Sequence, residues 1–327
     1  MAESSSSTKA VANTEEPNQD NQDEYYFYDS TLVVPPSGFI NLGAICWWNS
    51  LTQTLFRLPA FNRAMLGARE HLINKNKLGH TYIAIIENLL SPTPSTLKRE
   101  ELSIHLLRAF ASEASTRNKQ VNIQGQQSPA WGLNDFLDLI NVDDVSHVFN
   151  NKYERSVFCK QCHKRVSFNE DRSIFIQMYS INPMRTKKDF EDYIRNHMTH
   201  LDKYTCDICK TTYTNITRLE SLCMLREVIV IVFDKIQSVE RWFPDTLDFM
   251  STSDKYLKYK LVSQIEHSGS WDVRTGGGGH YWAQVFTPTN ANDTTTFISY
   301  NDTSVSSGQY SPSNTTHMIV YHLMAHE

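Results

Sequence analysis

The sequence predicts an α+β fold, because patterns typical of helices and patterns typical of strands occupy different parts of the chain. Between residues 46 and 140 apolar side chains recur at helical spacing, whereas from Leu222 onward short apolar runs alternate with turn-forming residues. Two Cys-x-x-Cys pairs lie between these regions. With 327 residues, 40% of them hydrophobic and 20% charged, the chain is long enough to bury a substantial core.

The helical part is predicted to contain four helices. The first carries Trp48, Leu51, Leu55 and Leu58 on one face, and Pro59 is expected to end it. The same spacing of apolar residues predicts three further helices, at about residues 82–90, 102–110 and 136–140.

The strands are predicted from short apolar runs bounded by Gly, Pro, Asn and Ser. The clearest is the run 228–233, which has no polar residue and is typical of a buried strand. Four more are expected at residues 256–265, 280–286, 296–300 and 317–323. The polar stretch 287–296 is interpreted as a hairpin loop, and an antiparallel sheet is expected.

Composition limits the partners and the compartment. Residues 1–30 are predicted to be a disordered acidic tail, because the first 24 carry almost no large apolar side chain. Lys and Arg total 31 against 36 Asp and Glu, so no nucleic-acid partner is expected. No apolar run predicts a membrane span, and the N-terminus lacks the apolar core of a secretory signal. The expected location is the cytoplasm, the nucleus or both, where cysteines stay reduced.

Four cysteines are predicted to bind a structural zinc ion. Cys159 and Cys162 form one Cys-x-x-Cys pair, and Cys206 and Cys209 form the other. Each pair can present two thiolates from one turn, and two such turns complete a tetrahedral site with Zn–S distances of about 2.3 Å. The distance between the pairs in sequence requires an elongated hairpin that brings them together. Alternative nitrogen ligands nearby are His163, His197 and His200.

Cys46 is a candidate nucleophile. It lies where the first predicted helix starts, so free backbone N–H groups and the helix dipole should favour its thiolate. His280 follows a run of four glycines at the start of a predicted strand, and Asn301 and Asp302 end the next strand with groups able to orient an imidazole. Cys, His and Asn or Asp in this order are found in cysteine proteases. Asn41 can place an amide beside the developing oxyanion.

Motifs around these residues resemble those of the ubiquitin-specific proteases, which are papain-like deubiquitinases. The family's cysteine motif, roughly G-L-x-N-x-G-x-x-C-Y-x-N-S-x-x-Q-x-L, is matched here by Gly38, Asn41, Gly43, Cys46, Asn49, Ser50, Gln53 and Leu55. Its histidine motif resembles Tyr259, Leu261, His267, Gly269 and residues 279–281, and its F-[DN]-D-x-x-V motif resembles residues 300–305. The resemblance extends from about residue 36 to the C-terminus.

The resemblance implies a catalytic domain over residues 31–327 with the papain-like fold of this family. Its parts would be a helical thumb at about 36–147, zinc-knuckle fingers at about 148–222 and an antiparallel β palm at about 223–327. The implied reaction is hydrolysis of the isopeptide or peptide bond after the C-terminal Gly-Gly of ubiquitin. Ubiquitin and ubiquitinated proteins are therefore the expected partners. Carried onto this sequence, the family pattern makes Cys46 the nucleophile and His280 the general base, with Asn301 orienting the histidine, Asp302 as a helper and Asn41 as oxyanion donor.

Substrate contacts are expected from Asp135, Trp47, Gly279 and Tyr281, and the candidate walls of a narrow channel for the Gly-Gly tail are Gly276 to Gly279, Trp47, Trp131 and Trp282. The sequence departs from the family motifs at Trp47 and at Gly132. Trp47 replaces the tyrosine that usually follows the cysteine, and Gly132 stands at the first acidic position of the family's Q-x-D-A-x-E-F-L motif, of which Asp135 keeps the second. In the family those acidic residues contact the basic tail of ubiquitin. Two alternatives therefore stay open: a protease for another ubiquitin-like modifier, and a non-catalytic ubiquitin-binding module.

Overall fold

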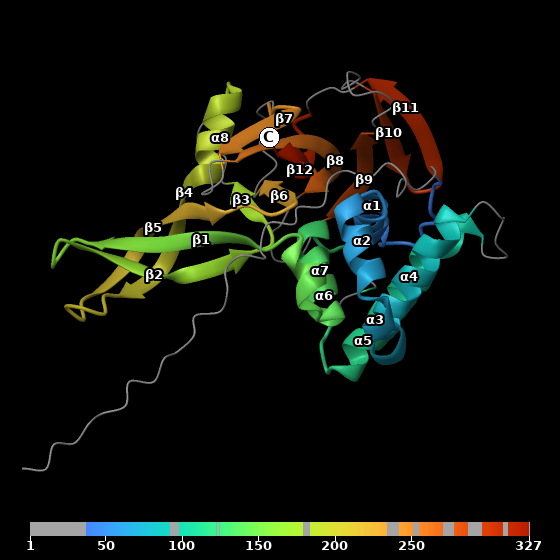
Figure 1. Cartoon of the computed structure of the whole chain (residues 1–327), viewed down its shortest axis with the longest axis horizontal. Helices are drawn as coiled ribbons and strands as arrows, with labels where there is room; N and C mark the ends of the chain where they lie inside the picture. Colours follow the sequence, from blue (N-terminus) through green and yellow to red (C-terminus); the bar gives the residue numbers. More distant parts are fainter. Residues whose placement is uncertain are drawn as a thin grey trace, which may run out of the picture.

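The computed structural model has helices packed against a large sheet and a second, smaller sheet that extends away from both (Figure 1). It describes residues 37–91, 98–121, 123, 125–178, 184–233, 242–250, 255–270, 278–286, 296–309 and 313–326. The predicted tail at 1–30, Gly276 and Gly277, and nearly all of the predicted loop at 287–296 lie outside these residues. The α+β class predicted from the sequence is confirmed.

Seven of the described helices lie in the first half of the chain. They are α1 (Cys46–Leu55), α2 (Pro59–Gly67), α3 (Arg69–Lys75), α4 (Lys77–Leu90), α5 (Leu102–Thr116), α6 (Pro129–Ile140) and α7 (Asp143–His147), with a 3-10 turn at Arg99–Glu101 before α5. Pro59 does not simply end a helix, because it is also the first residue of α2, where its missing N–H costs nothing. None of the described helices is both long and apolar enough to cross a membrane.

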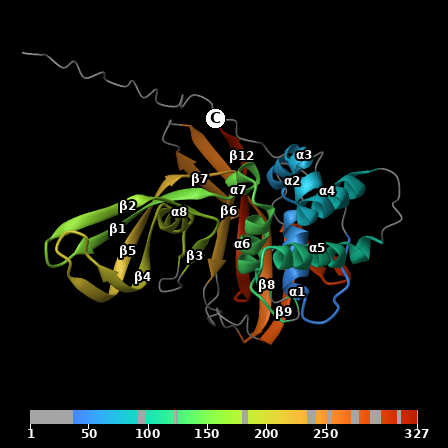
Figure 2. The same ribbon diagram turned by 90° about the horizontal axis from the view of Figure 1, so that it is seen from below.

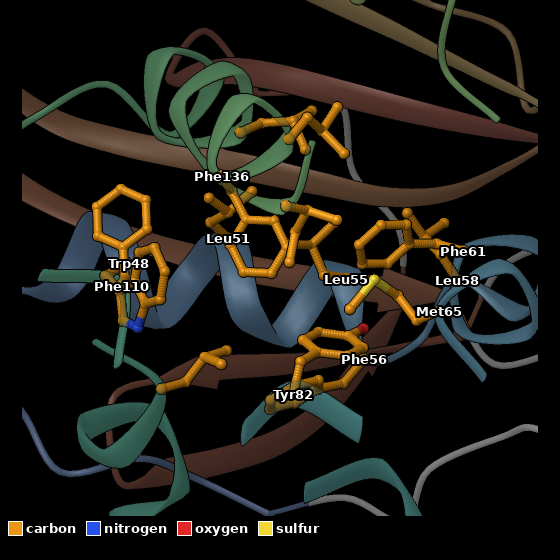
Figure 3. Close-up of a cluster of buried hydrophobic side chains, with 14 of the residues drawn as sticks. Trp48, Leu51, Leu55, Phe56, Leu58, Phe61, Met65, Tyr82, Phe110 and Phe136 are labelled. Carbon is orange, nitrogen blue, oxygen red and sulfur yellow. The ribbon is translucent and has the colours of Figure 1, made fainter. Parts of the chain in front are cut away.

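Helix α1 is the centre of the helical layer, and every one of its residues is buried. Aromatic side chains from four other helices surround it (Figure 3). The ring of Trp48 lies 4.7 Å from that of Phe110, and Phe56 lies 5.3 Å from Tyr82. Such packing fixes α1 rigidly and with it the position of Cys46, the first residue of the helix.

The large sheet has the strand order β11-β10-β9-β8-β12-β6-β3, with β7 paired to β8. Its strands are β3 (Ile176–Met178), β6 (Val228–Phe233), β7 (Thr246–Met250), β8 (Tyr256–Ser270), β9 (Gly278–Phe286), β10 (Thr296–Asn301), β11 (Ser304–Gln309) and β12 (Thr316–His326). All described pairs are antiparallel except β3 with β6. Helix α1 lies against β9, and the side chains of both belong to one buried cluster (Figure 2).

The smaller sheet has the order β2-β1-β5-β4 and reaches away from the helices (Figure 1). It consists of two hairpins, β1 (Asn151–Cys159) with β2 (Lys164–Ser173) and β4 (Asn196–Thr205) with β5 (Thr212–Met224), joined through β1 and β5. Helix α8 (Lys187–Arg195) precedes β4 and begins with a capping box between Thr186 and Asp189.

Candidate functional site

Cys46 lies at the start of α1 behind a tight turn. The turn is held by Asn41, whose Oδ1 accepts from the backbone N–H of Gly43 at 3.0 Å and of Ile45 at 3.4 Å. Gly43 has a φ of +131°, which a residue with a side chain rarely adopts, so glycine is needed here. The thiol of Cys46 is consequently held inside the molecule, with 2% of the residue exposed.

The electrostatics of Cys46 differ from the prediction based on the helix N-terminus alone. Burial raises the pKa of its thiol, and the carboxylate of Asp302 acts in the same direction. The backbone N–H groups of Tyr281 and Trp47 oppose this by favouring the thiolate, but they do not outweigh burial. Burial thus favours the thiol form of Cys46 over the thiolate.

His280 and Asn301 meet across the β9–β10 hairpin. Tyr300 pairs with Ala283 in the register of the two strands, which brings the end of β10 beside the start of β9. His280 Nε2 lies 2.7 Å from Asn301 Oδ1. The imidazole also stacks on Trp282, with the rings 6.2 Å apart and 19° from parallel. Between the described side chains of Cys46 and His280 there is no hydrogen bond.

Asp302 connects three segments of the site. Its carboxylate accepts from Asn41 Nδ2 at 3.0 Å and from Asn49 Nδ2 at 2.9 Å, and it lies 3.8 Å from His280 Nε2. Its backbone carbonyl accepts from the N–H of Phe39 at 2.8 Å. Sequence reasoning gave Asn49 no role, although Asn49 belongs to the same motif as Cys46. The amide of Asn41, predicted to bind the oxyanion, donates to Asp302 in this structure.

Gly38 allows the segment before Cys46 to pass close to the backbone of Asp302 and Thr303. A Cβ added at Gly38 would lie 2.4 Å from the carbonyl oxygen of Thr303 and 2.7 Å from that of Asp302. Only glycine permits so close an approach of two backbones. The glycine that opens the cysteine motif thus joins the segment before Cys46 to the turn after Asn301.

The predicted substrate-binding residues are distributed unevenly. Gly279 lies on β9 next to His280, and Tyr281 is fully buried on the same strand. Asp135 is half-buried on α6, and its Oδ2 accepts from Gln127 Nε2 at 3.3 Å. Burial raises the pKa of the Asp135 carboxyl.

The three tryptophans predicted to line a channel have different environments. Trp47 is completely buried against Trp48 and Gly132, which is at odds with a wall that touches substrate. Trp131 is 47% exposed on α6 and packs edge-on against Phe175. Trp282 is partly buried beside His280.

Gln126 is a residue of the site that sequence reasoning missed. It lies between α5 and α6, and its Nε2 donates to the carbonyl oxygen of Gly279. The same nitrogen is 4.0 Å from the sulfur of Cys46. No motif quoted from the sequence includes Gln126, so only the folded structure reveals this contact.

The two Cys-x-x-Cys pairs come together at the tips of the two hairpins. The sulfurs of Cys159, Cys162, Cys206 and Cys209 all lie within 4.8 Å of one another. Two of the separations are 3.5 Å between Cys159 and Cys209 and 3.9 Å between Cys162 and Cys206. The arrangement can hold a metal ion through four sulfur atoms. Of the alternative ligands, His197 is buried beside Glu220, with its Nε2 3.6 Å from the carboxylate, and the His200 side chain lies outside the described residues.

Comparisons with known proteins point to one family. The family model described as ubiquitin carboxyl-terminal hydrolase matches residues 37–323. Ubiquitin C-terminal hydrolase 12 of Arabidopsis thaliana is 24% identical over 295 residues, covering 80% of this chain and 25% of its own length. Ubiquitin carboxyl-terminal hydrolase 36 of Drosophila ananassae is 23% identical over 269 residues, covering 71% of this chain and 24% of its own. The chain thus spans about a quarter of the length of these curated relatives.

Solved structures show the same fold. The SAGA DUB module containing Ubp8 bound to monoubiquitin matches with a TM-score of 0.65 at 19% identity, over 88% of this chain and 69% of that one. The same module bound to ubiquitin aldehyde matches with a TM-score of 0.64 at 17% identity, over 90% of this chain and 71% of that one. The helical layer, the large sheet and the extended smaller sheet together form this fold.

Proposed function

Because the chain belongs to the ubiquitin carboxyl-terminal hydrolase family, we propose that it is a thiol-dependent deubiquitinase with Cys46 as nucleophile. What supports this proposal is that His280 and Asn301 meet at 2.7 Å, and that Asp302, 3.8 Å from His280, binds Asn41 and Asn49 on either side of Cys46 in sequence. Cys46, His280 and Asn301 are the residue types that a cysteine protease needs, in a site where a helix N-terminus faces a strand. The matched family region, residues 37–323, contains all of them.

The proposed reaction is cleavage of the bond after the C-terminal glycine of ubiquitin. His280 takes the proton of Cys46 as the sulfur attacks the carbonyl carbon, and then gives it to the leaving amine. Because His280 Nε2 donates to Asn301 Oδ1, Nδ1 keeps the lone pair that a general base requires. Water then hydrolyses the thioester.

The oxyanion in this reaction is assigned to two donors. They are the backbone N–H of Cys46 and the side-chain amide of Asn41, and each such donor contributes on the order of 3 kcal/mol. Asn41 Nδ2 carries two hydrogens, so it can keep its bond to Asp302 while it donates the second one. Asp302 thereby acts as a helper that positions both Asn41 and the imidazole.

The arrangement of the chain supports ubiquitin as the partner. In this proposal residues 36–147 form the thumb, 148–222 the fingers and 223–327 the palm, and the tail of ubiquitin enters between thumb and palm. The structural neighbours bound to monoubiquitin and to ubiquitin aldehyde are consistent with this partner. The absence of a carboxylate at Gly132 favours one alternative, a protease for another ubiquitin-like modifier.

We also propose that the four-cysteine cluster binds zinc. Four thiolates held tetrahedrally by zinc lie about 3.8 Å from one another, given a Zn–S distance of about 2.3 Å. The observed separations of 3.5 and 3.9 Å agree with this spacing. When bound, zinc would fix the tips of the two hairpins, far from Cys46, so its role would be structural.

The proposal is tested by reaction with ubiquitin that carries a thiol-reactive warhead at its C-terminus. The expected result is a covalent adduct that Cys46→Ala abolishes. A panel of other ubiquitin-like modifiers with the same warhead is tested in parallel. An adduct with one of those modifiers, and none with ubiquitin, would identify that modifier as the substrate. A folded protein that binds ubiquitin but forms no adduct with any probe would favour the non-catalytic binding module. Microscopy of the tagged chain tests the expected cytoplasmic or nuclear location.

A further inference from the structure

Strand β9 offers an open edge beside Cys46. In the part of the chain that the structure describes, it pairs with β8 from Gly278 to Val285 and, on its other side, with β10 at residues 283–286. Backbone groups of residues two apart point to the same edge of a strand. The carbonyl of Gly279 and the N–H of Tyr281 therefore face the same way, toward the side from which Gln126 donates to Gly279. An extended peptide lying on this edge would have its backbone next to the nucleophile.

The side chain of Gln126 occupies part of this edge. Its amide nitrogen donates to the carbonyl oxygen of Gly279 and lies 4.0 Å from Cys46 Sγ. Its amide oxygen is buried and has no hydrogen-bond partner among the described residues. Burying a hydrogen-bond acceptor without a partner costs free energy. The amide nitrogen of Gln126 is therefore bound favourably here, whereas its amide oxygen is not.

The nitrogen of Gln126 contacts both the carbonyl oxygen of Gly279 and the sulfur of Cys46. When a thiol attacks a carbonyl carbon, the reacting atoms approach to about 3–3.5 Å. The backbone N–H of the attacked residue lies two bonds from that carbon, in the space between the sulfur and the strand edge. Gly279 supplies the carbonyl there that such an N–H needs, and Gln126 already fills that need in the free protein.

We propose that Gln126 is an intramolecular substitute for the substrate backbone, and that the tail of the substrate displaces it by adding as a short extended strand to the open edge of β9. The inference rests on the proposed function and states how the Gly-Gly tail is held. Gln126 thus competes with the tail and takes no part in the chemistry.

The test is substitution of Gln126 in the full chain, measured in two ways. For hydrolysis of a fluorogenic ubiquitin C-terminal amide, Gln126→Ala should lower KM about 2- to 10-fold, the equivalent of one hydrogen bond, and leave kcat unchanged. Gln126→Asn, which keeps the amide but is too short to reach Gly279, should behave like Gln126→Ala. Gln120→Ala, at an exposed position in the same connection, is the matched control and should match the wild type.

The second measurement needs no ubiquitin. Iodoacetamide should alkylate Cys46 faster in Gln126→Ala than in the wild type, while the partly exposed Cys223 reacts at the same rate in both and serves as the internal reference. If the wild type failed to hydrolyse the ubiquitin amide, the proposed function would fall, and the alkylation rates would still decide whether Gln126 covers the sulfur. A lower kcat in Gln126→Ala would overturn the inference and make Gln126 an oxyanion donor. Unchanged KM and unchanged alkylation would overturn it as well.

Discussion

Gly132 is predicted to tolerate no side chain while Trp47 is present. A Cβ added at Gly132 would lie 2.6 Å from Trp47 Cζ3, 3.2 Å from Trp47 Cε3 and 3.3 Å from Leu51 Cδ2. Trp47 and Leu51 are completely buried, so neither can move aside without disturbing the core around α1. The two departures from the family motifs, the tryptophan after Cys46 and the missing carboxylate on α6, are therefore one packing arrangement.

The expected change in the free energy of unfolding follows from two opposing effects. Forcing an extra methyl group into a packed core costs about 1–3 kcal/mol, whereas Gly to Ala inside a helix gains about 1 kcal/mol. Gly132→Ala should therefore lower the free energy of unfolding by up to about 2 kcal/mol. Gly132→Asp should lower it further, because it also buries a carboxylate. With Trp47→Leu, which removes the ring, Gly132→Ala should become neutral or stabilising, so the two sites should couple by about 1–3 kcal/mol, the overpacking cost that is relieved.

The assay is urea denaturation followed by circular dichroism, for both single variants and the double variant. Gly67→Ala in α2 is the matched control, because an added Cβ there meets nothing within 4 Å. That control should leave stability unchanged or slightly higher. Additive effects of the two substitutions, or a Gly132→Ala variant as stable as Gly67→Ala, would refute the reasoning.

Three further predictions concern the triad, the cysteines and pH. Asn301→Ala should lower kcat/KM for the fluorogenic ubiquitin amide at least about tenfold, because His280 loses its 2.7 Å partner, and Asn301→Asp should restore most of it. Cys209→Ser should reduce the bound zinc measured by mass spectrometry and increase proteolysis of residues 148–222, while alkylation of Cys46 stays the same. Burial lowers the pKa of His322 to about 4, so its neutral form stabilises the fold above the ordinary histidine pKa of about 6.5 and this contribution is lost as pH falls toward 4. His322→Gln should flatten the fall in melting temperature between these pH values, and an unchanged slope would contradict the assignment.

Helices and strands with a strong pattern of apolar residues were predicted correctly from the sequence. The run 228–233 is strand β6 with the predicted bounds, and the predicted first helix starts at Cys46. Shorter or weakly apolar elements were missed, among them α3, α8 and β7. Helix α8 has only two buried residues, Phe190 and Ile194, so few apolar side chains mark it in the sequence.

Only those residues of the candidate site that belong to sequence motifs could be predicted. They indicated Cys46, His280 and Asn301, but the pKa of Cys46 depends on burial by segments far away in sequence. The burial of Trp47 depends on Gly132, and the contact of Gln126 depends on Gly279, across 153 positions. Such contacts cannot be predicted from local sequence patterns, because the two residues of each pair lie far apart in the sequence and neither belongs to a pattern that points to the other.

The place of β12 in the large sheet has a consequence for how the protein matures. β12 follows every other described strand in the sequence, yet it lies between β8 and β6 in the middle of the sheet. A nascent chain that already contains Cys46, His280 and Asn301 would still lack the strand that joins the β9–β10 hairpin, through β8, to β6. Because long-range strand pairing must wait for both partners, the part of the sheet that contains β9 and β10 should stay unconnected to β6 until residues 316–326 have left the ribosome.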